Sequence, residues 1–150
     1  MSLFVDENIE IAASTEAVWA ALTETDATSK WAPEFTGGAP FRIESGWRVG
    51  DAVGWITADG QILVGGVVTA ADPFALLRFT VVAAGTPDPG AESEDGIRYD
   101  LSEHGGVTTL RVRQGDFAPI DGGEGFYEQS VATWQRVLPL VKQLAEDSRH

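Results

Sequence analysis

The residue types that most often carry catalysis or bind metal ions are sparse in this 150-residue chain. It has no cysteine, which excludes disulfides, thiolate zinc sites, iron–sulfur clusters and thiol nucleophiles. Of its two histidines, His104 sits in a Glu-His-Gly-Gly turn and His150 is the last residue, so we do not expect them to converge. The sequence therefore predicts neither a histidine-based metal site nor a catalytic triad, and no cofactor.

Acidic side chains are the remaining candidates for acid–base chemistry. Glu92, Glu94 and Asp95 lie in a proline-rich loop, where we interpret them as a solvated run of charge rather than a catalytic pair. Asp116 precedes the last predicted helix, and Glu124 is its first residue. They are the two acidic candidates for a functional role, and the alternative is that they are ordinary surface residues.

Glycine-rich segments offer no nucleotide-binding motif. Gly37-Gly38, Gly65-Gly66 and Gly122-Gly123-x-Gly125 lack the strand-to-helix context and the lysine of a phosphate-binding loop. Gly65-Gly66 falls inside a predicted strand, where we expect a bulge that bends the sheet.

Arginines alternate with an acidic residue on the predicted outer face of the last two strands. Arg98, Arg111 and Arg113 share this face with Asp100. We favour ion pairs across the strands over an anion-binding site.

Net charge narrows the classes of partner. The chain carries 23 acidic and 10 basic side chains, a formal charge of −13. This charge repels phosphate backbones and anionic lipid headgroups, so neither nucleic acid nor a membrane is an expected partner. No apolar run approaches the roughly 20 residues of a membrane-spanning helix, and the first residues lack the features of a signal peptide. We expect a cytoplasmic protein consisting of one domain, residues 1–150.

Hydrophobic periodicity and turn residues predict an ordered series of elements. A first strand, 3–11, precedes two short helices, 15–22 and 26–31, with Ser14 as the N-cap of the first. Turn signals then separate six further strands, which we place at 41–48, 52–58, 61–70, 76–84, 96–103 and 107–115. Because their connections are short, the sheet is predicted to be antiparallel.

The last predicted helix, residues 124–147, has a broad apolar stripe that must lie against a sheet. Its stripe consists of Tyr127, Val131, Trp134, Leu138 and Val141, widened by Val137, Leu140 and Leu144. Pro139 lies within this helix and predicts a kink, because it removes the N–H that would bond to the carbonyl of Gln135.

This order of elements resembles the helix-grip fold of the START and birch-pollen-allergen (SRPBCC) superfamily. Four segments resemble the wording of its branch of homologues of the heat-shock protein 90 ATPase activator: residues 13–23 (Ala-Ser-Thr-Glu-Ala-Val-Trp-Ala-Ala-Leu-Thr), Trp31 with Pro33, residues 66–80 around Asp72-Pro73, and residues 107–112 (Val-Thr-Thr-Leu-Arg-Val). The resemblance implies an α+β fold with a curved antiparallel sheet of about seven strands around a long C-terminal helix.

Such a fold commonly leaves a mainly apolar cavity between sheet and helix. The residues that we place around it are Trp55, Phe79, Tyr99, Leu101, Val112, Phe126, Tyr127, Val131, Trp134 and Leu138. The alternative is that the same side chains close-pack into an ordinary core. Tyr99 is the best candidate for a functional polar group, because a buried phenol needs a hydrogen-bond partner.

The resemblance therefore favours a domain that binds a lipophilic or aromatic small molecule without covalent chemistry. One alternative is an enzyme of the polyketide cyclase or dehydratase type, which requires ionisable side chains with shifted pKa values inside the cavity. Another is a chaperone-related or other protein-interaction module, and a homodimer through the convex face of the sheet is compatible with the fold.

Overall fold

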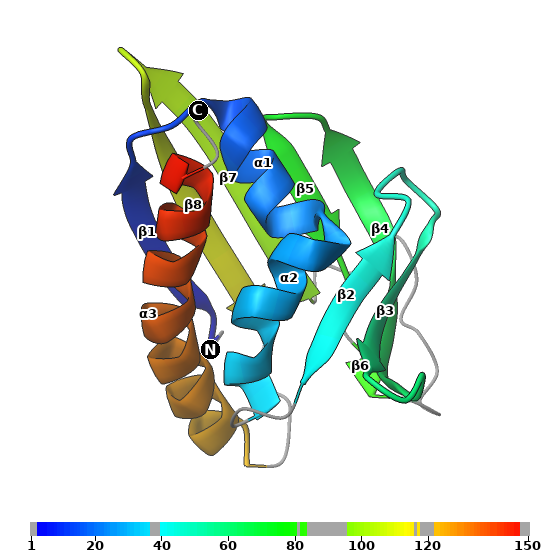
Figure 1. The fold of residues 1–150 in the computed structure, drawn as a ribbon. Coiled ribbons are helices and arrows are strands. Elements are labelled where there is room, and N and C mark those ends of the chain that lie inside the picture. The colour runs from blue at the N-terminus through cyan, green and yellow to red at the C-terminus, as the bar shows by residue number, and fades with distance from the viewer. Residues whose placement is uncertain are drawn as a thin grey trace.

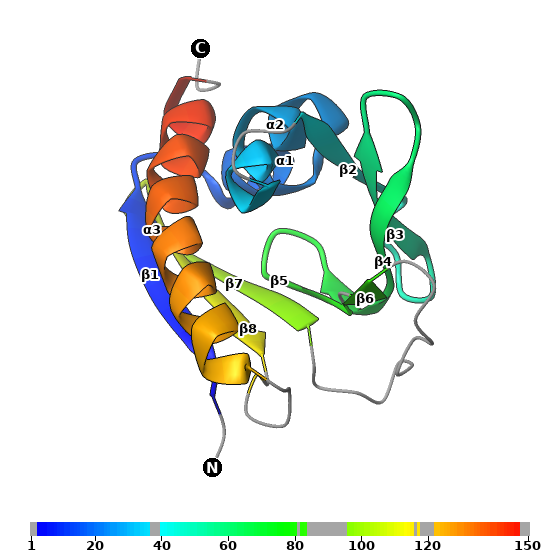
Figure 2. The same cartoon turned by 90° about the horizontal axis from the view of Figure 1, so that it is seen from below.

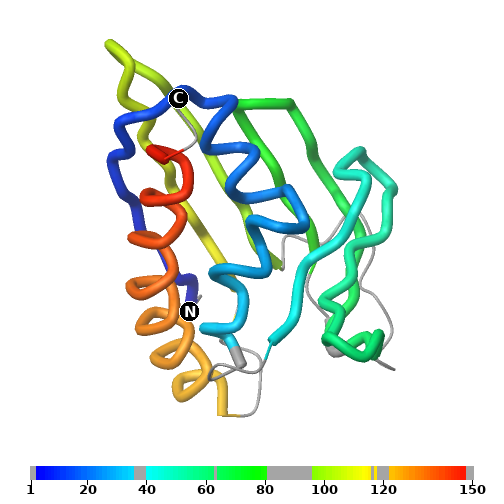
Figure 3. The backbone as a smooth tube through the Cα atoms, viewed as in Figure 1, coloured from blue at the N-terminus to red at the C-terminus, as the bar shows by residue number. Residues whose placement is uncertain are grey.

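The sheet of this protein is strongly curved, and its helices lie on the concave side (Figures 1 and 2). The computed structural model describes residues 3–36, 40–80, 82–83, 96–115, 117 and 122–147. The first and last elements, β1 and α3, lie side by side, and α3 also packs against α1 (Figure 3). This arrangement confirms the predicted α+β helix-grip fold.

Seven strands follow one another across the antiparallel sheet in the order β1-β8-β7-β5-β4-β3-β2, and the short β6 pairs with β4. Their bounds are Val5–Ile11 (β1), Phe41–Ser45 (β2), Ala52–Thr57 (β3), Ile62–Asp72 (β4), Leu76–Phe79 (β5), Val82–Ala83 (β6), Gly96–His104 (β7) and Val107–Gly115 (β8). Strand β1, near the start of the chain, pairs with β8, the last strand before the C-terminal helix.

Two short helices follow β1, as predicted. Helix α1 spans Thr15–Thr23, and the Ser14 hydroxyl accepts a hydrogen bond from the backbone N–H of Ala17 at 3.2 Å, which confirms the N-cap. Helix α2 spans Thr25–Trp31 and runs directly into a 3-10 helix, η1, over Ala32–Thr36. The predicted end of the second helix at residue 31 is confirmed, and proline fits near the start of η1 because its missing N–H needs no partner there.

The two faces of the sheet alternate as the sequence predicts. Tyr99 on β7 lies opposite Val112 on β8, and Leu101 lies opposite Leu110. All four side chains are buried, and the residues between them face outwards. This alternation fixes which side chains can reach the helices.

Two expectations about the middle strands were wrong in detail. The predicted strand 76–84 is divided into β5 and β6, which pair with different parts of β4. The register is regular at Gly65-Gly66, and the irregularities fall between Trp55 and Ile56 and between Val68 and Ala70. Gly66 instead allows close approach of the chain, since an added Cβ would lie 1.9 Å from the carbonyl oxygen of Thr80.

Helix α3, Gly123–Asp147, continues through the exposed Pro139. Its predicted apolar stripe is confirmed, because Trp134, Val137, Leu138 and Val141 are buried. Among the described residues, no helix has the length and apolar character needed to cross a membrane.

Candidate ligand-binding site

A chain of aromatic rings runs through the core from the sheet to Trp134 on α3 and on to η1. Phe79 and Tyr99 lie with ring centroids 5.9 Å apart, and Tyr99 lies 6.1 Å from Trp134. Phe35, from η1, continues the chain with centroid distances of 5.0 Å to Trp134 and 5.5 Å to Trp55. The fold therefore brings together four aromatic residues that the sequence predicted for the site: Trp55, Phe79 and Tyr99 on the sheet and Trp134 on α3. Phe35 contacts both Trp55 and Trp134.

The other predicted site residues divide by their exposure. Seven of the ten are buried in one core: Trp55, Phe79, Tyr99, Leu101, Val112, Trp134 and Leu138. Tyr127 and Val131 are partly buried against that core, whereas Phe126 is 52% exposed. Phe126 therefore lies apart from the buried group and belongs to a different surface.

That surface is an open groove of about 680 Å³ between η1, Phe117 and the first half of α3. Three phenylalanines, Phe35, Phe117 and Phe126, supply its main apolar area, together with Ala132. Polar side chains complete its lining: Glu34, Gln129, Ser130, Thr133 and Arg136. Because Phe35 both lines this groove and contacts Trp134 and Trp55, the groove is continuous with the aromatic core.

One edge of the groove is charged. The Nε of Arg136, on α3, lies 3.3 Å from the Oε2 of Glu34, on η1. The same guanidinium donates to the Thr133 hydroxyl at 3.4 Å. This ion pair ties η1 to α3 beside Phe35, and as a partly exposed pair it contributes little to stability.

The indole N–H groups of the core differ in their partners. Trp134 donates to the Oε1 of Gln114 at 2.8 Å, and Trp31 donates to the carbonyl oxygen of Ala21 at 2.9 Å. The Nε1 of Trp55 is buried and has no hydrogen-bond partner in the described part of the chain. An unpaired buried donor costs free energy, so the Trp55 indole lacks the stabilising hydrogen bond that Trp134 and Trp31 make.

Tyr99 is the ionisable group at the centre of the aromatic chain. Its burial removes water from the phenol, which raises its pKa well above the ordinary value. At physiological pH the side chain is therefore neutral. It can donate or accept a hydrogen bond, but it cannot act there as a phenolate base or nucleophile.

Of the histidine and acidic candidates for chemistry, the two in the described part of the chain do not line this groove. His104 is exposed near the turn between β7 and β8, and Glu124 is exposed in the first turn of α3. His150, Asp116, Glu92, Glu94 and Asp95 lie outside the described residues. The described ranges hold no cluster of histidine, aspartate and glutamate suited to a metal ion.

The fold and its groove can be compared with known proteins. The family model described as Activator of Hsp90 ATPase homolog 1-like protein matches residues 12–146. The chain belongs to this family. No match was found among curated proteins.

Solved structures with the same fold accompany the family match. Protein MLL2253 from Mesorhizobium loti is 20% identical with a TM-score of 0.72, and the match covers 96% of this chain and 97% of that one. The Aha1 dimer from Colwellia psychrerythraea is 22% identical with a TM-score of 0.69, covering 95% and 96%. DynU16, a putative protein in the dynemicin biosynthetic locus, is 17% identical with a TM-score of 0.69, covering 99% of this chain and 49% of that one.

Sequence reasoning missed three residues that shape the site in this member of the family. Phe35 follows Pro33 by two positions, in a segment without an apolar period, and its place depends on η1. Phe117 lies between β8 and α3 and became relevant only once both were placed. Gln114 could have been found, because it continues the inward-facing alternation of Leu110 and Val112.

Proposed function

We propose that this protein binds a lipophilic or aromatic small molecule in the groove between η1 and α3. The observation that carries the proposal is the position of Phe35, whose ring forms part of the groove and contacts the buried rings of Trp55 and Trp134. A ligand resting on Phe35 would meet aromatic surface at once. Burial of apolar ligand surface, at roughly 25 cal/mol per Å², supplies the affinity.

Orientation of the ligand would come from few polar groups. The unpaired Nε1 of Trp55 would donate to a ligand oxygen if movement of Phe35 opened a path from the groove. The neutral phenol of Tyr99 lies further along the same chain of rings. Both are donors, which favours ligands that carry carbonyl, ether or hydroxyl oxygen on an apolar body.

Binding without covalent chemistry is favoured over the polyketide cyclase or dehydratase alternative. That alternative requires at least two ionisable side chains with perturbed pKa values at the substrate. Tyr99 is one such group, while Glu34 and Arg136 at the edge of the groove are paired with each other. The similarity to DynU16, a putative protein in the dynemicin biosynthetic locus, is the reason to test the enzyme alternative as well. Any compound that binds can be assayed for turnover.

A thermal-shift screen against fatty acids, flavonoids, sterols and polyketide-like aromatics tests the proposal. A ligand at 100 times its dissociation constant stabilises the native state by about 2.7 kcal/mol, several degrees for a protein of this size. A saturable hit identifies the ligand class. A flat panel, with binders of related folds as working controls, would favour the protein-interaction alternative.

Two variants of α3 locate the site of any hit. Ala132→Trp fills the groove from an exposed position, so we expect it to abolish the ligand-induced shift without lowering the melting temperature of the free protein. Gln135→Trp places the same side chain at an exposed position of α3 outside the groove lining. Equal binding by both variants would place the ligand elsewhere.

Replacement of Tyr99 by phenylalanine tests how far the ligand reaches. If the phenol faces the ligand, Tyr99→Phe weakens binding and costs little stability. An equal loss of stability without ligand would instead make the phenol a structural hydrogen-bonding group.

Homodimerisation and a cytoplasmic location are further parts of the proposal. The Colwellia relative was solved as a dimer. A dimer through the convex face of the sheet would have to cover ion pairs of Arg98 and Arg111, although charged residues are depleted at interface centres. Sedimentation velocity on the purified protein decides whether a dimer forms.

A further inference from the structure

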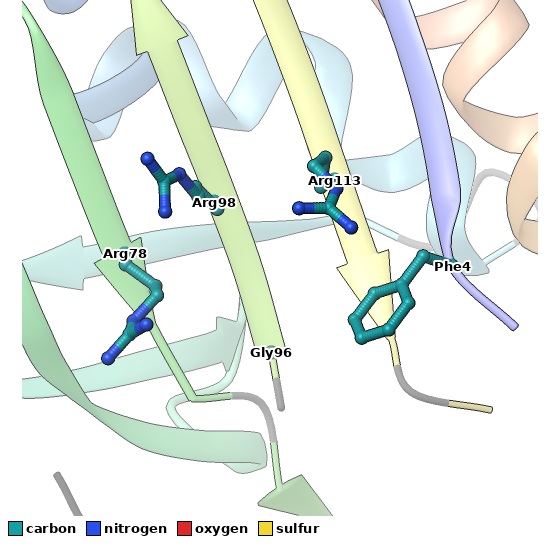
Figure 4. A pocket seen from close by; sticks show the side chains of 5 residues that line it. All are labelled: Phe4, Arg78, Gly96, Arg98 and Arg113. Atoms are coloured by element: carbon teal, nitrogen blue, oxygen red, sulfur yellow. The ribbon is translucent and has the colours of Figure 1, made fainter. Parts of the chain in front are cut away.

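The convex face of the sheet carries a row of three arginines. Arg78 on β5 lies directly opposite Arg98 on β7, and Arg98 lies directly opposite Arg113 on β8. Like charges in directly opposed positions destabilise a sheet. Figure 4 shows the three side chains on one face, with Phe4 beside Arg113.

Among the described residues, carboxylates form ion pairs with only some of the arginines on this face. Asp100 binds Arg98 through two hydrogen bonds, of 2.9 and 3.1 Å, within the same strand. Asp6 binds Arg111 across strands, at 2.6 and 2.8 Å. The expected cross-strand pairing is therefore found for Arg111, whereas the pair of Arg98 lies within β7. Neither carboxylate forms an ion pair with Arg78 or Arg113.

The guanidinium groups of Arg113 and Arg78 contact an aromatic ring and a hydroxyl group instead of carboxylates. That of Arg113 lies over the Phe4 ring, 5.0 Å from its centroid, and its Nε is buried without a hydrogen-bond partner in the described residues. The Nε of Arg78 donates to the Thr69 hydroxyl at 2.9 Å. Within the described part of the chain, the terminal nitrogens of Arg78 and Arg113 form no hydrogen bond or ion pair, and we infer that they can donate to a ligand.

A pocket of about 120 Å³ lies among these groups, lined by Phe4, Arg78, Gly96, Arg98 and Arg113. Gly96 is part of this lining. Its position requires glycine, because φ is +125° and an added Cβ would lie 2.1 Å from the carbonyl oxygen of Phe79. A cavity needs roughly 10–15 Å³ to hold one water molecule, so the pocket has room for a small anion.

We propose that this pocket is a binding site for a tetrahedral oxyanion, either free phosphate or sulfate or the phosphate or sulfate group of a small molecule. Arg113 and Arg78 line the pocket from β8 and β5 and would supply the donors, while Arg98, which is paired with Asp100, lies between them. Guanidinium groups match such oxygens with paired, charge-assisted hydrogen bonds. The bound anion also relieves the repulsion within the row.

The overall charge of the chain limits the ligand to a small one. At −13 the protein repels long polyanions such as nucleic acids and anionic membranes. A small anion in the pocket lies within a few ångströms of the arginines, whereas charges beyond about 8 Å are largely screened at physiological salt. The site is separate from the groove beside α3 and does not depend on the function proposed for it.

Isothermal titration calorimetry with inorganic phosphate at low ionic strength tests the site, with sodium chloride of equal ionic strength as the blank. We expect saturable binding that weakens about tenfold or more in Arg113→Gln and in Arg78→Gln, the loss expected for a hydrogen bond between charged groups. Arg48→Gln is the matched control, because it removes the same charge at a side chain that is 87% exposed and distant in sequence from the row. We expect it to bind phosphate like the unmodified protein.

Three results would overturn the proposal: no saturable binding of phosphate, equal weakening in Arg48→Gln, or unchanged binding in both row variants. If Arg113→Gln fails to fold, Arg78→Gln alone carries the test, since Arg78 is only partly buried. Titrations with sulfate, acetate and phenyl phosphate then distinguish a free tetrahedral anion from a carboxylate and from an esterified ligand. Stronger binding of acetate than of phosphate would contradict the assignment to a tetrahedral anion.

Discussion

The groove beside α3 and the arginine pocket on the convex face differ in almost every physical property. The groove is large, about 680 Å³, and rests on the buried aromatic core through Phe35. The pocket is about 120 Å³, and its main side chains are three arginines and Phe4. The groove that we propose for an apolar ligand is lined by η1, Phe117 and α3, whereas the pocket that we propose for a small anion lies on the convex face of the sheet.

This difference follows from the alternation of the strands. Neighbouring residues of β7 and β8 point to opposite faces, so buried Tyr99 and Val112 lie beside outward-facing Arg98 and Arg113. The helices lie on one face, and the arginine row lies on the other (Figures 2 and 4). We therefore expect the two faces to contribute differently to the stability of the fold, which the following predictions test.

The largest effect is expected from Trp134→Ala on the groove side. Trp134 is fully buried, contacts Tyr99 and Phe35, and donates to Gln114. Its truncation should lower the free energy of unfolding by about 3–5 kcal/mol, measured by urea denaturation. Phe126→Ala, at an exposed position of the groove, should change it by less than about 0.5 kcal/mol. Similar losses in both variants would show that the groove and core are not distinct layers.

Two glycine replacements, one in the sheet and one in α3, should change the stability of the protein in opposite directions. Gly96→Ala, at the end of the arginine pocket, forces a side chain into a positive-φ conformation against Phe79 and should cost about 1–3 kcal/mol. Gly125→Ala, in the first turns of α3, meets nothing within 4 Å and should stabilise by about 0.5 kcal/mol. The melting temperatures of both variants measure these changes. An unchanged melting temperature for Gly96→Ala would contradict the predicted backbone strain at this position.

The core beneath the groove should lose stability at alkaline pH because of Tyr99. Burial raises the pKa of its phenol, so above about pH 10 the unfolded chain releases a proton that the folded chain retains. Stability then falls with rising pH, by about 1.4 kcal/mol per pH unit for this one group. Urea denaturation at pH 9 and pH 11 should show a smaller difference for Tyr99→Phe. Equal differences for both proteins would rule the phenol out as the cause.

The smallest effect is expected on the convex face at acid pH. The hydrogen bonds from Arg111 hold the pKa of Asp6 below its ordinary value. The stabilisation is present above about pH 4, the pKa region of an unfolded aspartate, and is lost as pH falls through the folded pKa. Because the Asp6 side chain is 41% exposed, we expect only about 0.2–1 kcal/mol. Asp6→Asn should abolish this acid-dependent part in denaturation at pH 7 and pH 3, and an unchanged pH dependence would contradict it.

The sequence predicted the fold well because each element has a local signal. The Ser14 cap, the apolar stripe of α3 and the alternation in β7 and β8 depend on nearby residues and were all confirmed. The break between β5 and β6 was not predicted, since it depends on pairing with two different parts of β4. The Gly66 contact with Thr80 likewise joins residues that are distant in the chain.

The candidate sites were less predictable than the fold. An apolar period shows that Trp134 and Tyr99 face inwards, but it cannot show whether they border open space or each other. The arginine row was visible only as alternation of Arg98, Arg111 and Arg113, and Arg78 joined it through the register of β5 with β7. Ion pairs depend on such register, which no local pattern determines.

By itself, the sequence determined the element types, the inward and outward faces of the late strands and the acidic character of the chain. These follow from periodicity and composition, which act over a few residues. Only the tertiary structure decided that Phe35 joins the groove to the core and that Arg78, Arg98 and Arg113 form one row. Both arrangements bring together residues far apart in the chain, and their positions depend on how the elements pack and pair.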